Sequence, residues 1–432
     1  MSPARLLAVR SLVSIRKSAR YANLELDAQI KKANLSERDT ALFTALVYGV
    51  IEREITLDFY LSSFCNRKGR SLSPFLRATL QCALYQLCYM DNVPARAVLY
   101  ESAEIAKLSE QTAGAKLVTA VLHAFLRAKE NDTDLFLSLS GIEKKSVLYS
   151  IPQWMIRLWK DGYGEEQTDE ICQSFQTSAD TCLHVNALKC DADTLCRQFR
   201  EAGLNADIHP ADEHLILLSG SHGDVRRLPG YDEGLFFAQD YSSARAAKAL
   251  NAVPGTRVAD VCAAPGGKSF SLALSMQNQG VIYSSDLHAS RVRLIDNGAK
   301  RLGINIIQTC TRDARESPKE LIGTLDRVLC DVPCSGLGIL AKKPDLRHKT
   351  EEEIRSLPKI QREILSGGAL LLARGGRLVY STCTLNPQEN ENVVNDFLND
   401  NSDFTLVEPP TTLFPKAGEW DGFFFAVLEK TR

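Results

Sequence analysis

The chain has 432 residues, of which 44% are hydrophobic and 24% are charged. These proportions are ordinary for a globular protein, and the length allows two or three domains. The formal net charge of −2 at pH 7 points to no polyanionic partner. No run of about 18 uncharged apolar residues occurs, so no membrane span is predicted. The N-terminal residues are interrupted by Arg5, Arg10 and Arg16 and lack the pattern of a signal peptide, which predicts a cytosolic protein.

The twelve cysteines agree with a reducing compartment. Most of them lie inside apolar runs such as "LQCALYQLCYM", where a thiol packs as a small hydrophobic group. The single CxxxC spacing, between Cys330 and Cys334, has no second half with the spacing of zinc ligands. The sequence therefore favours neither a disulfide framework nor structural zinc, and no metal is expected.

Residues 1–135 are predicted to form an all-α domain. "SERDTALFTALVYGV" opens with Ser36 and Asp39 at the spacing of a capping box and continues with apolar residues three and four apart. "SPFLRATLQCALYQLCYM" is a second long helix, and two further helices are predicted over residues 95–108 and 115–130. Nothing in this region alternates with a period of two.

Two further regions follow the helical one. The polar, turn-rich residues 130–146 are predicted to be a linker, and residues 145–233 a small α+β segment that connects the domains and binds RNA. In this segment, strands at 182–188 and 214–220 flank a helix that ends at Gly203.

Residues 234–432 alternate between apolar strands and helices. The runs "RVADVC", "GVIYSSD", "RVLCDV" and "GGRLVYST" are each followed by a loop and a helix. This alternation predicts an α/β, Rossmann-like domain built on a doubly wound parallel sheet.

The first of these strands leads into "VADVCAAPGGKSFSLAL", a glycine-containing loop before a helix. Gly267, Lys268 and Ser269 match the end of a Walker phosphate loop, but Cys262 occupies the position of its leading glycine. The dinucleotide pattern Gly-x-Gly-x-x-Gly is not met either. Neither common phosphate-binding loop is therefore predicted.

Two acidic residues follow at later strand ends. Asp286 ends the next strand, where an acid bonds ribose hydroxyls in this fold class, and Asp313 is placed to meet the adenine end of a nucleoside. A ribose-binding acid without a pyrophosphate loop indicates a nucleoside cofactor that lacks phosphates, and S-adenosylmethionine fits. The alternative is that Asp286 only caps a helix.

Two strand ends carry thiols. Asp331 and Cys334 follow one strand and Cys383 follows another, so all three are expected at the edge where such sheets bind ligands. The pair could be a metal site, a disulfide, a redox pair, a nucleophile with a helper, or two core cysteines. A thiolate that adds to C6 of cytosine makes C5 able to take a methyl group from a sulfonium, while Asp331 would hold the pyrimidine at N3 and N4.

Three motifs now identify a family. "DVCAAPGGKS", "DVPCSGLG" and "YSTCTLNPQENE" closely resemble those of the RNA cytosine-C5 methyltransferases of the NOL/NOP/Sun type. The resemblance implies that Cys383 is the covalent nucleophile, that Cys334 assists product release, and that Asp331 and Lys268 also belong to the catalytic group. It implies S-adenosylmethionine contacts from Cys262, Ala263, Ala264, Pro265, Gly266, Gly267, Lys268, Asp286, Asp313 and Asp331.

The N-terminal helices resemble the NusB-type RNA-binding domain, and this combination is similar to the RsmB (Sun) branch of the family. The resemblance implies methylation of one cytosine in 16S rRNA, expected to be cytosine 967 in the usual rRNA numbering. The substrate is expected to be unassembled rRNA, because the base must leave its stack. His184, Thr119 and His123 replace the Arg, Asn and Arg that relatives carry, which would weaken RNA contacts.

Basic clusters at residues 15–20, 225–228 and 341–349 are compatible with an RNA partner, although solvated surface is the simpler interpretation. Two other functions stay open. The same chemistry could act on transfer RNA, or the chain could be a non-catalytic, NusB-like RNA-binding factor. Presence of Cys383, Cys334 and Asp331 argues against the non-catalytic function. Whether the N-terminal domain also binds a protein is not determined.

Overall fold

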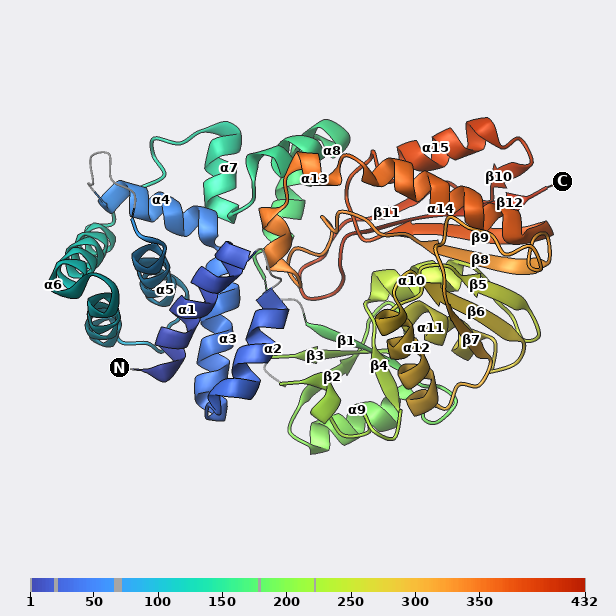
Figure 1. Ribbon diagram of the computed structural model, residues 1–432, viewed down its shortest axis with the longest axis horizontal. Coiled ribbons are helices and arrows are strands. Elements are labelled where there is room, and N and C mark those ends of the chain that lie inside the picture. The colour runs from blue at the N-terminus through green and yellow to red at the C-terminus, as the bar shows by residue number, and fades with distance from the viewer. Residues whose placement is uncertain (1, 19–21, 66–71, 178–179, 221–222, 432) are drawn as a thin grey trace. The chain divides into compact units, whose positions relative to one another are not determined.

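The computed structural model describes residues 2–18, 22–65, 72–177, 180–220 and 223–431. The last two residues of the basic cluster 15–20, Ala19 and Arg20, lie outside these ranges. The chain divides into two compact units (Figure 1). One contains residues 1–158 and 343–348, and the other contains residues 159–342 and 349–432.

The first unit is helical, as predicted. Ser36 and Ser73 cap two of its helices by accepting a hydrogen bond from the backbone N–H three residues later. The longest helix is interrupted at Glu110 and Gln111, whose backbone is not helical, so the two helices predicted there are confirmed. The helices are α1 (Pro3–Ser18), α2 (Ala22–Ala33), α3 (Glu37–Glu52), α4 (Glu54–Phe64), α5 (Pro74–Tyr89), α6 (Ala95–Glu130) and α7 (Gly141–Tyr149).

Helix α7 lies partly within the stretch that was predicted to be a linker. Its residues are polar, but the Thr56 hydroxyl of α4 donates to the Val147 carbonyl at 2.5 Å. The Ser150 hydroxyl, just after α7, accepts from the Ile55 N–H at 3.1 Å. These contacts with α4 order a segment whose own sequence pattern is weak.

One short stretch from late in the chain also belongs to the first unit. The 3-10 helix η2 (Pro344–His348) packs against α3, and His348 Nε2 lies 3.2 Å from Glu54 Oε2. The sequence pattern does not predict this placement.

The second unit contains a four-stranded antiparallel sheet in the order β2-β3-β1-β4. Helix α9 packs against one face of this sheet, and Gly203 follows it with φ +82°, as expected for the residue after a helix end. Helix α8 (Gln153–Ser174) begins in the first unit and ends in the second. It is followed by β1 (Thr181–Val185), α9 (Ala192–Glu201), β2 (Asn205–Ile208), β3 (Leu215–Ser219), η1 (Val225–Arg227) and β4 (Phe236–Ala238). Strand β4 lies in residues 234–240, which the sequence indicated as the start of the methyltransferase domain, yet it pairs with β1.

The rest of the second unit is built on a larger sheet in the order β10-β12-β9-β8-β5-β6-β7, with β11 paired to β12. Strands β9, β8, β5, β6 and β7 are parallel neighbours, as predicted. Strands β10, β11 and β12 are not: β12 is antiparallel to β9, so the sheet is mixed. The strands are β5 (Arg257–Asp260), β6 (Val281–Asp286), β7 (Ile307–Thr311), β8 (Leu325–Asp331), β9 (Leu372–Thr382), β10 (Phe404–Leu406), β11 (Thr411–Leu413) and β12 (Phe423–Lys430).

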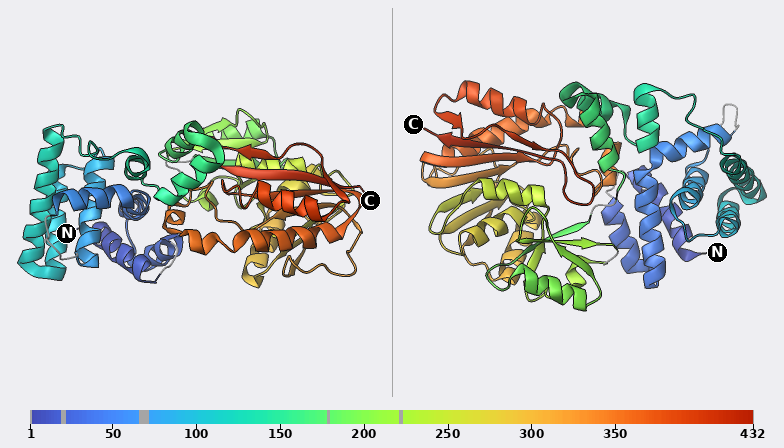
Figure 2. Two further views of the ribbon diagram at one scale, coloured as in Figure 1. Left: turned by 90° about the horizontal axis from the view of Figure 1, so that it is seen from above. Right: turned by 180° about the vertical axis from the view of Figure 1, so that it is seen from behind.

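Helices cover both faces of this sheet (Figures 1 and 2). One face packs against α10 (Tyr241–Ala249), α11 (Gly267–Ser275) and α12 (Ala289–Leu302). The other packs against α14 (Leu357–Leu371) and α15 (Glu391–Asp400), while the short α13 (Glu351–Ile354) precedes α14. This arrangement leaves the strand ends for the functional loops.

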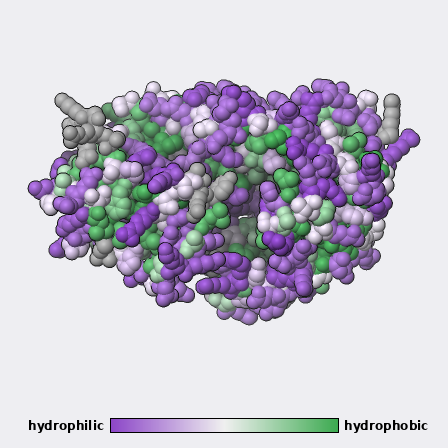
Figure 3. Space-filling model, viewed as in Figure 1, coloured by the Kyte–Doolittle hydropathy of each residue, from purple (hydrophilic) through white to green (hydrophobic). Residues whose placement is uncertain are grey.

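The surface and the thiols agree with the composition. Polar residues predominate on the face shown in Figure 3, with apolar residues interspersed. All twelve cysteines lie in the described ranges, and none forms a disulfide. Among the described residues, every helix is too short or too polar to cross a bilayer.

Candidate active site

The predicted site residues come from the carboxyl ends of adjacent parallel strands. Asp286 and Asp331 are the last residues of β6 and β8, and Asp260, which was not predicted, is the last residue of β5. Asp331 lies opposite Ser381 of β9 in the sheet register. Because parallel strands end at the same edge, these loops share one edge of the sheet.

The loop between β5 and α11 is tightly turned. Gly266 precedes α11 with φ +115°, and a Cβ built on it would lie 2.4 Å from the Phe270 ring. The Ala263 N–H donates to the Ser285 carbonyl at 2.8 Å, which ties the loop to the end of β6. The Ala264–Pro265 bond is cis. The loop therefore requires glycine before the helix, where backbone N–H groups face a ligand.

Asp286 is buried near this loop. It accepts from the His288 N–H at 3.1 Å, so it also serves the start of α12, and Arg291 Nε lies 3.6 Å from its Oδ2. Arg291 donates in turn to the Ala264 carbonyl at 2.7 Å. The acid predicted to bind ribose and the loop predicted to bind the cofactor are thus joined through one arginine.

Asp313 follows β7 and is held by Arg315. The Arg315 Nε lies 3.0 and 3.1 Å from the two carboxylate oxygens, and its Nη2 lies 2.6 Å from Oδ2. The hydrogen bonds that Arg315 donates to Asp313 lower the pKa of Asp313. Any contact between Asp313 and an adenine would compete with this ion pair.

Asp331 and Lys268 form a second ion pair, between the β8 end and α11. Lys268 Nζ donates to Asp331 Oδ2 at 2.8 Å, and the Ser381 hydroxyl donates to Oδ1 at 2.8 Å. Lys268 Nζ also lies 5.0 Å from the centre of the Phe423 ring. Both carboxylate oxygens are therefore oriented before any base is present. The sequence did not single out Ser381 or Phe423.

The two predicted cysteines lie in contact. Cys334 Sγ and Cys383 Sγ are 3.3 Å apart, and both side chains are half-buried. The hydrogen bond with Cys383 and then burial raise the pKa of Cys334 well above its usual value. Cys334 therefore keeps its proton more firmly than an ordinary thiol does.

Asp260 is a buried acid that the sequence analysis did not select. Burial raises its pKa to about 7, although the Ser269 hydroxyl donates to its Oδ2 at 2.7 Å. Its Oδ1 is buried and has no hydrogen-bond partner among the described residues. Burial also raises the pKa of the neighbouring Cys262 well above its usual value, so Cys262 is a neutral thiol.

His184, which was expected to affect RNA contacts, lies beside helix α11, where the Ser271 hydroxyl is 3.3 Å from its Nδ1. Its ring stacks on Phe237, and its Nδ1 lies 2.7 Å from Gln239 Oε1. The Ser271 hydroxyl of α11 donates to the same Gln239 oxygen at 2.5 Å. Burial lowers the pKa of His184 to about 4, so the ring is uncharged at neutral pH.

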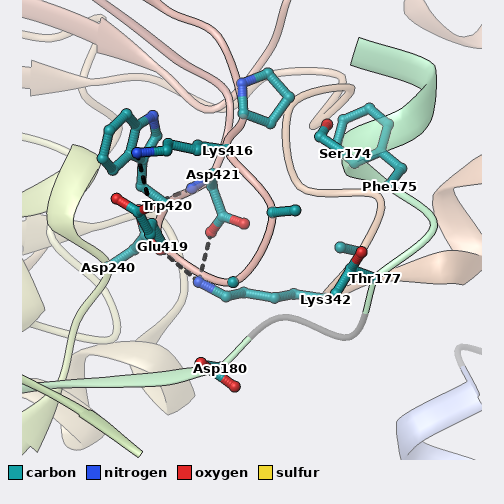
Figure 4. Close-up of a pocket in the computed structure, with 14 residues that line it drawn as sticks. Ser174, Phe175, Thr177, Asp180, Asp240, Lys342, Lys416, Glu419, Trp420 and Asp421 are labelled. Atoms are coloured by element: carbon teal, nitrogen blue, oxygen red, sulfur yellow. Dashed lines mark hydrogen bonds and ion pairs between the residues drawn. The ribbon is translucent and has the colours of Figure 1, made fainter. Parts of the chain in front are cut away.

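The basic cluster 341–349 is not a patch of unpaired cations. Lys342 donates to Asp240 at 2.5 Å and to Asp421 at 2.8 Å beside a small pocket (Figure 4). In the cluster at 225–228, Arg226 pairs with Asp224. Both clusters are partly neutralised by neighbouring acids.

Comparisons with known proteins agree with these domains. The 16S rRNA methyltransferase RsmB/F family matches residues 247–429, the NusB family matches residues 2–127, and the ferredoxin-like domain of RsmF/B-like methyltransferases matches residues 151–225. A helical NusB domain, a ferredoxin-like domain and a methyltransferase domain thus define the class of the protein.

Individual relatives cover the whole chain. It is 34% identical to a Synechocystis protein named "Probable ribosomal RNA small subunit methyltransferase B", covering 100% of each chain. A Bacillus subtilis protein of the same name is 34% identical over 94% of this chain and 90% of its own. The crystal structure of PH0851 superposes with a TM-score of 0.80 at 25% identity, covering 100% of this chain and 99% of that one. The chain belongs to the RsmB/F family of 16S rRNA methyltransferases, and the resemblance seen in its motifs is confirmed.

Proposed function

We propose that this protein methylates C5 of one cytosine in 16S rRNA, expected to be cytosine 967, through a covalent bond between Cys383 and the base. The observation that carries the proposal is the pair of sulfur atoms 3.3 Å apart, in which Cys334 keeps its proton. A thiol that keeps its proton is a poor nucleophile, so Cys383 is the better candidate of the two.

The reaction begins when the Cys383 thiolate adds to C6 of the cytosine, forming an S–C6 bond. The electron pair of the C5–C6 double bond shifts to C4–C5 and that of the C4–N3 double bond shifts onto N3, so C5 becomes a nucleophile. Asp331 would hold the base by accepting a hydrogen bond from its N4 amino group. S-adenosylmethionine, when bound, would supply the methyl group to C5 from its sulfonium and would leave as the thioether. Loss of the C5 proton to a base expels the Cys383 thiolate and restores the double bond.

The loop residues fit S-adenosylmethionine, which supplies the methyl group when bound. The cradle at Gly266 has no room for a side chain, and Asp286 is buried at the end of β6, where ribose-binding acids lie. We assign Cys262 to Lys268 and Asp286 to cofactor binding, and Asp313 after release from Arg315.

The RNA is proposed to be 16S rRNA before assembly. A base in a helix must leave its stack to place C6 against Cys383. The NusB-like helices and the ferredoxin-like segment would supply RNA contacts. We infer a cytoplasmic protein, because that compartment holds the proposed substrate.

Bisulfite sequencing of 16S rRNA from a deletion strain beside its parent tests this proposal. Loss of protection at one cytosine in the mutant is the expected result. Unchanged 16S rRNA together with an unprotected transfer RNA cytosine would move the substrate to transfer RNA. No change in either RNA would favour a non-catalytic RNA-binding protein.

A further inference from the structure

Two adjacent residues, Glu389 and Asn390, lie behind the cysteine pair. Both have a relative exposure of 0%. They belong to the turn that precedes α15, whereas the cysteines belong to the loops after β8 and β9. The Tyr380 hydroxyl of β9 donates to the Glu389 carbonyl at 2.5 Å and anchors this turn to the sheet. Burying an acid and an amide has a free-energy cost unless their polar atoms are bonded, so their partners are informative.

Glu389 holds the backbone on both sides of Cys334. The Ser335 N–H donates to Glu389 Oε2 at 2.9 Å. On the other side, Gln361 Nε2 donates both to Glu389 Oε2 at 2.8 Å and to the Pro333 carbonyl at 3.0 Å. Both neighbours of Cys334 are therefore tied to one carboxylate, directly or through one amide.

Asn390 does the same for Cys383. The Thr382 hydroxyl donates to Asn390 Oδ1 at 2.6 Å, and Asn390 Nδ2 donates to the Thr384 carbonyl at 3.0 Å. Both neighbours of Cys383 are therefore tied to one amide side chain.

The two cysteine loops are also joined to each other. The Ser335 and Thr384 hydroxyl oxygens lie 2.6 Å apart, and the Gly338 N–H donates to the Cys383 carbonyl at 3.0 Å. A Cβ on Gly338 would lie 2.1 Å from the Gly422 carbonyl oxygen, so this close approach requires glycine.

We propose that Glu389 and Asn390 are positioning residues that set the separation of the two sulfur atoms, Glu389 through the Cys334 loop and Asn390 through the Cys383 loop. Because the two residues are joined by one peptide bond, the hydrogen bonds of Glu389 to the Cys334 loop and those of Asn390 to the Cys383 loop are fixed relative to each other. The effect of this positioning on catalysis rests on the proposed covalent mechanism. The positioning itself does not depend on that mechanism. The negative charge of Glu389 also adds to the hydrogen bond and burial that raise the pKa of Cys334.

The chain provides its own matched controls, because Glu391 and Asn392 repeat the pair Glu-Asn directly afterwards. Glu391 accepts from the Thr412 hydroxyl at 3.1 Å, and Asn392 is exposed. Within the described ranges, neither side chain is bonded to residues 333–335 or 382–384.

The first test needs no RNA. Phenylarsine oxide joins two close thiols as one arsenic bonded to two sulfurs, with release of water, and Cys334→Ala and Cys383→Ala identify the pair. Asn386 Nδ2 donates to the other oxygen of Glu389, Oε1, at 2.9 Å. Glu389→Gln is therefore expected to weaken arsenical binding about tenfold or more, because the new amide N–H₂ must face at least one of these three N–H donors. Asn390→Ala should do the same, while Glu391→Gln and Asn392→Ala should match wild type. Equal affinity in all four variants would overturn the proposal.

Should Glu389→Gln fail to fold by near-ultraviolet circular dichroism, Gln361→Met replaces it. This variant removes only the bridge to Pro333, so the same loss of arsenical affinity is expected to a smaller degree. Wild-type affinity in Gln361→Met and Asn390→Ala would overturn the proposal in that case.

The second test uses turnover on 16S rRNA transcripts. Glu389→Gln and Asn390→Ala are expected to lower kcat about 10–100-fold without changing KM for S-adenosylmethionine. Glu389→Gln should accumulate covalent protein–RNA adduct, because it disturbs Cys334, whereas Asn390→Ala should slow adduct formation. A purely structural role would lower thermal stability without separating these two effects.

The two proposals fail in different ways. Methyl transfer by Cys383→Ala would contradict the covalent mechanism and leave the arsenical result standing. An inactive Cys383→Ala, with Glu389→Gln and Asn390→Ala as active as the Glu391 and Asn392 controls, would overturn only the positioning role.

Discussion

Cys334 and Cys383 are 49 residues apart in sequence, yet their sulfur atoms lie 3.3 Å apart. At this distance two thiolates would repel each other strongly, so the pair retains at least one proton. The raised pKa of Cys334 assigns that proton to Cys334. The retained proton agrees with the separate roles proposed for the two cysteines.

Cys383→Ala is expected to lower methyl transfer by roughly 10³-fold or more, because the proposed bond to C6 is lost. S-adenosylmethionine binding, measured by calorimetry, should stay at the wild-type value. Cys190→Ala, a half-buried cysteine of the ferredoxin-like domain, is the control and should stay active. Activity in Cys383→Ala close to that of this control would contradict the nucleophile assignment.

Cys334→Ala is expected to trap the covalent protein–RNA adduct, because the thiol beside the bond to C6 is lost while Cys383 remains. The adduct should appear as a denaturation-resistant band of lower mobility when enzyme, S-adenosylmethionine and 16S rRNA are mixed. The double variant Cys334→Ala/Cys383→Ala should show no band. Free turnover by Cys334→Ala would exclude its role in release.

Gly266→Ala is expected to lower S-adenosylmethionine affinity tenfold or more, since the new Cβ would lie 2.4 Å from the Phe270 ring. Gly255→Ala is the matched control, because Gly255 has φ +88° and open space around its Cβ position. Both variants lose about 1–2 kcal/mol of stability from a positive φ. Only Gly266→Ala should lose cofactor affinity in calorimetry, and equal affinities would place the cofactor elsewhere.

Asp260 should make stability depend on pH. Its pKa is raised from 3.8 to about 7 by burial, so between about pH 4 and pH 7 the folded chain holds a proton that the unfolded chain has lost. The free energy of unfolding therefore falls as pH rises through this window and levels off above it.

Asp260→Asn removes the contribution of Asp260 to the pH dependence of unfolding, because an amide does not titrate. The amide oxygen can still accept the hydrogen bond from Ser269. Between pH 5 and pH 7.5, the variant should gain about 2–4 kcal/mol relative to wild type in urea unfolding. Asp207→Asn, at a side chain that is 79% exposed, is the control and should follow wild type. Parallel curves for wild type and Asp260→Asn would show that Asp260 is charged when folded.

Much of this protein was predictable because its signals are local. Ser36 predicted the start of α3, and Gly203 predicted the end of α9. The apolar runs before Asp286 and Asp331 predicted the strands β6 and β8. These features depend on residues within a few positions of each other. Helix α7 was missed because contacts with α4 order it.

The sequence alone determined which chemical groups this protein carries at its strand ends: a glycine-containing loop, two thiols and several acids. Only the tertiary structure decided which of them touch. It brought Lys268 to Asp331 across 63 residues, tied Glu389 and Asn390 to two separate loops, and paired β12 antiparallel to β9. The physical reason is that such contacts depend on how distant segments pack and bury their polar atoms, which no local pattern of residues specifies.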